Sequence, residues 1–307
     1  MENIDFILEL LYLSVNLAIP LILGALCGTI AERSGVILLG VEGLMLFGSF
    51  FGVLGVHITG IPWLGVLLAL VVGAIAGLIY AIFALKFRAQ QSVVGVGINL
   101  LGSGLTAVLL KIVWNKEGMS STVKPVPNIT IPLLNKIPII GRLFDNQSPF
   151  IYITIIIVLL TWFVMYKTKY GLRVRAIGEN PYAAQTSGNS VNKYRYVALI
   201  ISGAIAGLAG AYLSISQNNL FVTDMVAGRG FMGLAANIFG GWNPLGSVAA
   251  SFIFSIAQAV RFKFIDYQIP THLISMLPYV TTLIVLTIVG IKSKSSSAPA
   301  GLGKLVD

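Results

Sequence analysis

Long runs of apolar residues constrain the fold of this chain more than any other feature. A helix that crosses a bilayer needs about 20 apolar residues, because each residue adds about 1.5 Å and the hydrocarbon layer is about 30 Å thick. Charged residues make up only 10% of the 307 residues, against about 25% in soluble proteins, so most of the surface cannot face water. We therefore predict an all-α polytopic membrane protein, with membrane-crossing helices over residues 9–30, 36–56, 62–85, 92–113, 150–166, 196–216 and 272–291.

A further apolar run, 231–260, is too long for one straight crossing, and the sequence GGWNP at 240–244 interrupts it. We expect two helical pieces there. A broken helix is tolerated at membrane depth only where neighbouring protein or a water-filled cavity covers the freed backbone groups. With this run included, the chain has enough apolar sequence for about 8–10 membrane helices, which we assign to one domain over residues 1–291.

The distribution of basic residues predicts which loops are cytoplasmic, since loops on that side carry an excess of Lys and Arg. Residues 167–195 contain one acidic residue, Glu179, and the basic residues Lys167, Lys169, Arg173, Arg175, Lys193 and Arg195. We place this segment in the cytoplasm and loop 114–149 outside. The net charge of +9 then reflects topology rather than a nucleic-acid surface. Residues 292–307 are rich in Ser, Ala, Gly and Pro, which predicts a disordered cytoplasmic tail.

The hexapeptide GAIAGL occurs twice, at 73–78 and 203–208. Each copy contains two glycines four residues apart, a spacing that lets membrane helices approach closely; the four glycines are Gly73, Gly77, Gly203 and Gly207. Convergent helix packing is one explanation of this match. A second match follows in the same order, because GVGINLLGSG at 95–104 aligns with GLAANIFGGW at 233–242. We interpret the two ordered matches as an internal duplication.

The two copies are predicted to have opposite orientations, because the span with residues 73–78 runs inward and the span with residues 203–208 runs outward. We therefore expect inverted halves, 1–145 and 146–291, related by a two-fold axis in the membrane plane. In transporters with such repeats, solute binds near the midplane at the interface between the repeats. Asn99 and Asn237 would be symmetry mates at that interface.

Polar residues within apolar sequence are candidates for a translocation path. Glu42 is the clearest, since an unpaired ionisable group inside a span costs several kcal/mol; the alternative is a place near the interface or a structural partner such as Arg33. Asn and Trp side chains can bind hydroxyl-rich or heterocyclic solutes, although an interhelical hydrogen bond is the commoner use of an Asn. The candidates are Glu42, Asn99, Gln217, Asn237, Trp242 and Asn243.

The sequence lacks the features of a self-contained motor. It contains no chain of Asp, Glu or His within spans that would suggest proton coupling, and no GxxxxGK[ST] phosphate-binding loop. The one cysteine, Cys27, excludes an intrachain disulfide and a cysteine-rich metal site. We expect no cofactor and no metal on this chain. If the chain is an importer, it has no motor of its own and needs one from a partner.

The segment AIGENPYAAQTSGN (176–189) is polar, although apolar spans lie on both sides of it. Asn180 can cap a helix, and Pro181 suits the first turn of that helix. Gly188 can end it in the left-handed conformation. One interpretation is an ordinary polar loop. The other is a short cytoplasmic helix that docks onto another protein.

Three motifs in order make the chain resemble the permease subunits of bacterial binding-protein-dependent ABC importers of the branched-chain amino acid, ribose and nucleoside type. ERSGVILLGVEGLM (32–45) is similar to their N-terminal signature, and GRGFMGLAANIFGGWNPLG (228–246) to their C-terminal one. The residues of these motifs are most similar to those of the simple-sugar and nucleoside subgroup, and closest to those of guanosine-type uptake permeases. One departure is Leu38-Leu39, where many relatives have an Asn. GLRVRAIGENPYAAQTSGNSVNKYR (171–195) resembles their coupling-helix region in Gly178, Asn180, Ala183, Ala184, Gly188 and Lys193.

The resemblance implies a multi-pass permease of the bacterial cytoplasmic (inner) membrane that gives a nucleoside or simple sugar alternating access to the two sides. Its partners would be a second, homologous permease subunit, a cytoplasmic ABC ATPase that binds ATP and Mg²⁺, and an extracytoplasmic solute-binding lipoprotein. The ATPase would contact a coupling helix with Gly178, Glu179, Asn180, Ala183, Ala184 and Gly188, Glu179 lying near the ATPase groove. Two alternatives stay open: a self-sufficient secondary transporter of a small polar solute, and a membrane-embedded enzyme or scaffold.

Overall fold

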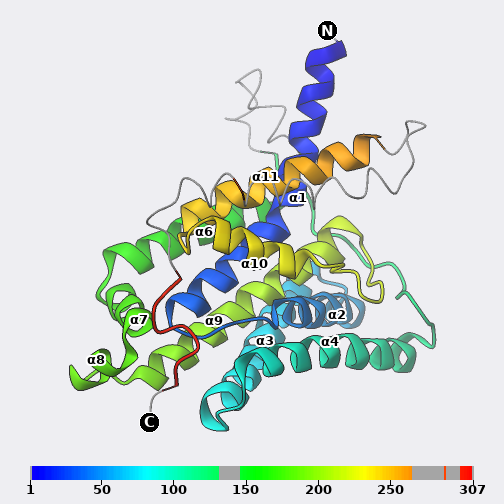
Figure 1. Ribbon diagram of the computed structural model, residues 1–307. Coiled ribbons are helices and arrows are strands. Elements are labelled where there is room, and N and C mark those ends of the chain that lie inside the picture. Colours follow the sequence, from blue (N-terminus) through cyan, green and yellow to red (C-terminus); the bar gives the residue numbers. More distant parts are fainter. Residues whose placement is uncertain (1, 131–145, 265–286, 288–297, 306–307) are drawn as a thin grey trace.

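The structure is a computed structural model that describes residues 2–130, 146–264, 287 and 298–305. Over these residues the regular secondary structure is helical, apart from the isolated β-bridges Met119–Val222 and Ile129–Gln147. Seven of the described helices are long and apolar enough to cross a membrane. In Figure 1 they form a bundle in which α9 runs through the middle and α4 lies along one edge.

The long helices largely follow the predicted ranges. The predictions for 9–30, 36–56, 62–85, 92–113, 150–166 and 196–216 each fall on one described span, so the all-α membrane fold is confirmed. The predicted crossing at 272–291 lies outside the described residues, apart from residue 287. The long helices are α1 (Glu2–Arg33), α2 (Val41–Thr59), α3 (Pro62–Ala81), α4 (Gln91–Trp114), α6 (Pro149–Lys167), α9 (Val191–Ala211) and α11 (Pro244–Phe264).

The predicted interruption of the run 231–260 is also confirmed. A shorter helix, α10 (Arg229–Phe239), is separate from α11, and between them Gly241 and Trp242 have φ values of 68° and 54°. A left-handed backbone ends a helix, and Pro244 lacks the N–H that a continuous helix would use. Both pieces pack on α1, so neighbouring protein covers the break, which we call the 240–243 break.

α2 begins at Val41 rather than at residue 36. Gly35 has a φ of 87°, and residues 36–40 form a connection without a helical turn. Such a left-handed backbone is readily adopted only by glycine, so the chain can reverse direction between α1 and α2 at this point. The shift places Glu42 in the first turn of α2.

α3 and α9 form the most extensive helix contact among the described elements, and glycines lie at their crossing. A Cβ on Gly73 would collide with the carbonyl oxygen of Gly203, and a Cβ on Gly203 would collide with that of Gly73. The two backbones therefore touch directly, with no side chain between them. Small residues allow such an approach in membrane helices, where packing and not hydrophobicity drives association.

The contacts beside this crossing are reciprocal. A Cβ on Gly77 would meet the carbonyl oxygen of Leu199, and a Cβ on Gly207 would meet that of Ala69, so α3 and α9 run antiparallel. Each helix also continues into a π-helical turn at the same place after its GAIAGL segment: η1 (Ile82–Lys86) and η3 (Tyr212–Gln217). Two copies of one unit related by a two-fold axis would show this reciprocity, which supports the predicted inverted duplication.

Candidate functional site

Glu42 caps the N-terminus of α10. Its Oε1 accepts a hydrogen bond from the backbone N–H of Gly228 (2.7 Å), and its Oε2 accepts one from Gly230 (2.8 Å). The first N–H groups of a helix lack intrahelical acceptors and carry partial positive charge, so a carboxylate satisfies both needs. Glu42 therefore has a structural partner, and that partner is α10 rather than Arg33.

Asn237 lies fully buried in a polar network around Glu32. Its Oδ1 accepts a hydrogen bond from the Thr29 hydroxyl (2.7 Å), and its Nδ2 donates to Glu32 Oε2 (2.8 Å). The indole Nε1 of Trp242 donates to the same Glu32 oxygen (2.5 Å). The network fastens α10 and the 240–243 break to α1. Glu32 begins the N-terminal motif but is not among the predicted path residues, although an acidic residue near the end of an apolar span is a usable signal.

Asn99 uses both ends of its amide to hold α4 against the start of α2. Its Oδ1 accepts a hydrogen bond from the Gly43 N–H (2.8 Å), and its Nδ2 donates to the Leu39 carbonyl (3.0 Å). A Cβ on Gly102 would also crowd the backbone of Gly43. Both asparagines thus make interhelical hydrogen bonds, but Asn99 bonds backbone groups whereas Asn237 bonds side chains.

The remaining two path candidates take no part in the side-chain hydrogen bonds of this network. The Asn243 Oδ1 accepts a hydrogen bond from the Leu245 N–H (3.0 Å), which caps the start of α11. Gln217 is exposed at the end of η3. The structure therefore brings Asn237 and Trp242 together at Glu32. Glu42 and Asn99 instead bond backbone groups of neighbouring elements, and Gln217 lies apart from the other candidates.

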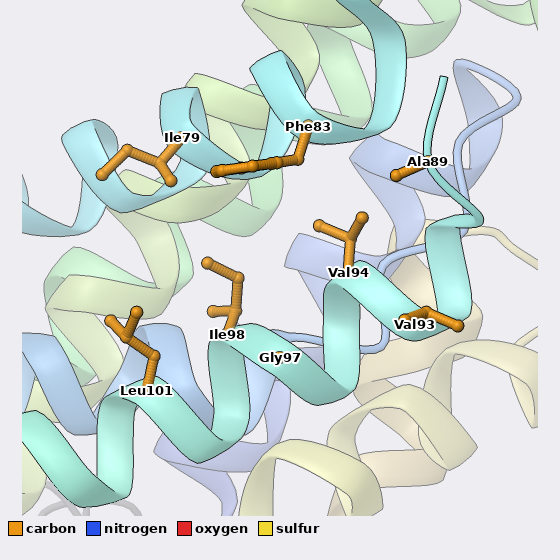
Figure 2. Close-up of a pocket in the computed structure, with 8 residues that line it drawn as sticks. All are labelled: Ile79, Phe83, Ala89, Val93, Val94, Gly97, Ile98 and Leu101. Carbon is orange, nitrogen blue, oxygen red and sulfur yellow. The ribbon is translucent and has the colours of Figure 1, made fainter. Parts of the chain in front are cut away.

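A cavity of about 360 Å³ lies between α3 and α4 (Figure 2). None of the path candidates lines it. Its lining side chains carry no hydrogen-bonding group, so it suits an apolar group rather than a polar solute. The lining residues are Ile79, Phe83, Ala89, Val93, Val94, Gly97, Ile98 and Leu101.

The polar segment 176–189 contains the predicted short helix. α7 (Lys169–Glu179) ends at Glu179, and α8 (Pro181–Thr186) follows directly. The Asn180 Oδ1 accepts a hydrogen bond from the Ala183 N–H (3.1 Å), and Gly188 has a φ of 82°. Cap and stop are thus at the residues that the sequence indicates, and α8 lies at one end of the molecule (Figure 1).

The two alanines of α8 face in different directions. Ala183 is exposed, whereas Ala184 is buried in a small cluster with Ile177 and Val191. Ala184 therefore packs α8 onto α7 and α9. Of the two alanines that the resemblance assigns to ATPase contact, the exposed one is Ala183.

Residues 298–305, predicted as part of a disordered tail, are instead held by backbone hydrogen bonds. The Gly301 N–H donates to the Gly178 carbonyl (2.8 Å), and the Gly303 N–H donates to the Gly35 carbonyl (3.0 Å). Both acceptors lie where close backbone approach is possible, because neither residue has a Cβ. The segment joins the end of α7 to the connection between α1 and α2.

Known proteins match this chain over most of its length. Residues 10–286 match the family described as branched-chain amino acid transport system / permease component. The guanosine ABC transporter permease protein NupQ of Bacillus subtilis is 38% identical, and the nucleoside ABC transporter permease protein NupC of Lactococcus lactis is 34% identical; each match covers 88% of both chains. A second Bacillus subtilis protein, the guanosine ABC transporter permease protein NupP, is 29% identical over 76% of this chain and 68% of its own.

A solved structure has a similar fold. A metal-chelate type ABC transporter in an inward-facing conformation matches with a TM-score of 0.50 at 15% identity, and the match covers 95% of this chain and 100% of that one. At this identity the likeness concerns the fold alone, and it agrees with the helical membrane architecture. From its sequence and its fold together, the chain belongs to the branched-chain amino acid transport system / permease component family and is a multi-pass permease component of an ABC transporter.

Proposed function

We propose that this chain is the translocation subunit of an ATP-driven importer of purine nucleosides. The observation that carries the proposal is the 38% identity with a guanosine permease over 88% of both chains. Membership of the ABC permease family favours this function over a self-sufficient secondary transporter and over an enzyme. A simple sugar is the alternative solute, since the C-terminal motif also resembles that of simple-sugar permeases.

We infer that the functional unit contains a second, different permease chain. The chain is similar to both NupQ and NupP, which are two guanosine permease proteins of one organism. An importer of this type also needs a cytoplasmic ABC ATPase, which supplies ATP and Mg²⁺ chemistry, and an extracytoplasmic binding protein. The site residues of this chain do no chemistry themselves.

The ATPase would dock on the exposed face of α8. Tyr182 and Ala183 are exposed there, and Ala183 leaves room for a partner's side chain. Because Ala184 is buried against Ile177 and Val191, α8 and α7 would move together when the ATPase closes. This rigid unit is what a coupling helix requires.

The translocation path would run beside α10, the short helix next to the break. Its start is fixed by Glu42 and its end by the network around Glu32. In this proposal Glu42, Asn99, Asn237 and Trp242 shape the walls of the path by holding helices in place. The exposed Gln217 is the candidate for direct contact with solute.

Uptake in proteoliposomes tests the proposal. The vesicles would contain this chain, the second permease, the ATPase and the binding protein, and labelled guanosine would be supplied outside. We expect ATP-dependent uptake that other purine nucleosides inhibit and glucose does not. Inhibition by sugars alone would assign the solute to the alternative class, and uptake without ATP would contradict the importer mechanism.

A variant of the docking face gives a second test. Ala183→Trp should prevent co-purification of the ATPase and abolish uptake, because the new ring occupies the exposed docking face. Leu100→Trp, on a side chain that is 69% exposed on α4, is the matched control and should keep both properties. Equal behaviour of the two variants would exclude α8 as the docking helix.

A further inference from the structure

One side chain, Arg33, connects the end of α7 to the 240–243 break. Its Nε donates a hydrogen bond to the Trp242 carbonyl (2.8 Å), and its Nη2 donates to the Gly241 carbonyl (3.2 Å). Its Nη1 lies 3.6 Å from Glu179 Oε1 at the end of α7. The planar guanidinium, with its five donors, can serve both elements at once.

The two carbonyl acceptors belong to backbone that no regular helix satisfies. Gly241 and Trp242 have left-handed φ values and lie just beyond the C-terminal end of α10, where the partial charge of a helix is negative. A cation is favourable at this place. Arg33 therefore bonds the backbone of the break, while Glu32 bonds the Trp242 side chain.

The end of α7 meets α1 at the same point. A Cβ on Gly178 would collide with the carbonyl oxygen of Arg33, so α7 touches the end of α1 backbone to backbone. Glu179 is the last residue of α7, and Asn180, which caps α8, follows it. Glu179 therefore lies between the start of α8 and the Arg33 guanidinium.

The ion pair itself is a weak source of stability. The Glu179 side chain is 54% exposed and that of Arg33 is 18% exposed, and pairs that face water contribute little to folding. The hydrogen bonds to the break, by contrast, depend on the position of the guanidinium. This combination suits a group that transmits position rather than one that holds the fold together.

We propose that Arg33 is the positioning residue through which movement of α7 and α8 repositions the 240–243 break, and hence α10. The inference rests on the proposed function, since it assigns α8 to the ATPase and α10 to the path. ATPase closure displaces α8, Glu179 carries Arg33 with it, and the guanidinium moves the carbonyls of Gly241 and Trp242. Trp242 and Asn237 then shift against Glu32 at the end of α10.

The test measures uptake and ATP hydrolysis together in the complete transporter. Arg33→Gln should keep ATPase binding and basal hydrolysis, while nucleoside taken up per ATP falls at least about tenfold, roughly the effect of losing a charge-assisted hydrogen bond. Arg33→Lys should recover only part of this ratio, because an ammonium reaches one element and not both. Arg173→Gln is the matched control: it removes an exposed arginine of α7 that bonds Tyr194 and should leave the ratio unchanged.

A charge exchange separates this role from that of a simple ion pair. Arg33→Glu combined with Glu179→Arg restores opposite charges, but a carboxylate cannot donate to the carbonyls of the break. The proposal predicts no recovery of uptake per ATP. Recovery to the wild-type ratio would overturn it, and so would an unchanged ratio in Arg33→Gln.

Hydrogen exchange gives a readout that does not depend on uptake. In the wild-type complex, amide exchange at residues 240–243 should change when a non-hydrolysable ATP analogue binds the ATPase. In Arg33→Gln and Arg33→Lys this response should disappear or weaken, and a response equal to wild type would contradict the proposal. If the wild-type complex takes up no nucleoside with ATP, the proposed function fails, and the exchange experiment still decides whether Arg33 links the two segments.

Discussion

α9 and α4 differ far more in burial than in hydropathy. Their spans have mean hydropathies of 1.9 and 2.0, yet 83% of the most apolar stretch is buried in Val191–Gln217 and only 28% in Gln91–Trp114. Small residues account for the difference, because they let backbones touch, as in the GAIAGLAGA sequence of α9. Outward-facing large residues mark α4, namely Val93, Val96, Leu100, Leu105, Val108 and Ile112. Hydropathy thus identifies a span, whereas the placement of glycines indicates which span is central.

The largest expected effect comes from placing the same substitution in both helices. Gly203→Leu should destabilise the protein by more than about 3 kcal/mol, because its side chain would enter the backbone of α3. Gly104→Leu on α4 meets open space and should be neutral or stabilising by up to about 1 kcal/mol, since leucine favours a helix over glycine. Thermal unfolding in detergent and the yield of membrane-inserted protein measure both. Similar losses of stability in the two variants would show that the placement of glycines does not distinguish the central span from the peripheral one.

The second effect contrasts the anchors of α10 and α4. Glu42→Ala leaves the N–H groups of Gly228 and Gly230 without their acceptors and should cost about 2–3 kcal/mol. Asn99→Ala removes neutral hydrogen bonds from the outer helix and should cost about 1–2 kcal/mol. Unfolding midpoints of the purified variants rank the two. A larger loss for Asn99→Ala would show that the peripheral helix is the better secured one.

A smaller effect is expected where residues 298–305 contact the end of α7. Removal of residues 298–307 takes away hydrogen bonds to Gly178 and Gly35, each worth about 1 kcal/mol, so amides at the end of α7 should exchange roughly tenfold faster. Tyr182→Phe is a graded control, since it deletes only the hydrogen bond to the Leu305 carbonyl. Unchanged exchange after the truncation would mean that the segment does not hold α7.

The smallest effect belongs to the exposed end of α4. The Lys111 ammonium, which bonds the Glu117 carboxylate at 2.7 Å, holds the pKa of Glu117 below its usual range. A lowered carboxyl pKa stabilises the folded state above the unfolded pKa, and this contribution disappears as the pH falls through the folded pKa. Because both side chains face water, Lys111→Met should leave the unfolding midpoint unchanged at pH 7 and at pH 4. A clear loss at pH 7 alone would show that the pair matters.

Most spans and the 240–243 break could be predicted because apolar length and the GGWNP sequence are local signals. The start of α2 could not, since the length of an apolar run does not reveal a turn at Gly35. The partner of Glu42 was equally out of reach: Gly228 lies 186 positions away, and its contribution is a backbone N–H without a side-chain signal.

Helix α8 and residues 298–305 show the same limit in another form. The cap and stop of α8 were readable from Asn180 and Gly188, yet a helix of six residues is too short for its buried face to be assigned from periodicity. Ala184 therefore appeared equivalent to Ala183. Residues 298–305 are held by backbone hydrogen bonds between small residues, and the amino-acid composition does not indicate such contacts.

Residues 298–305 follow every long helix of the described chain, and they complete the contact between Gly35 and Gly178. Chains fold from the N-terminus as synthesis proceeds, so this contact forms late, after the helices on which it rests. The surface that we propose for the ATPase would then reach its final shape only on chains that were translated past the last of these helices. A prematurely terminated copy would lack that shape, and the ATPase would therefore bind it less well than the full chain.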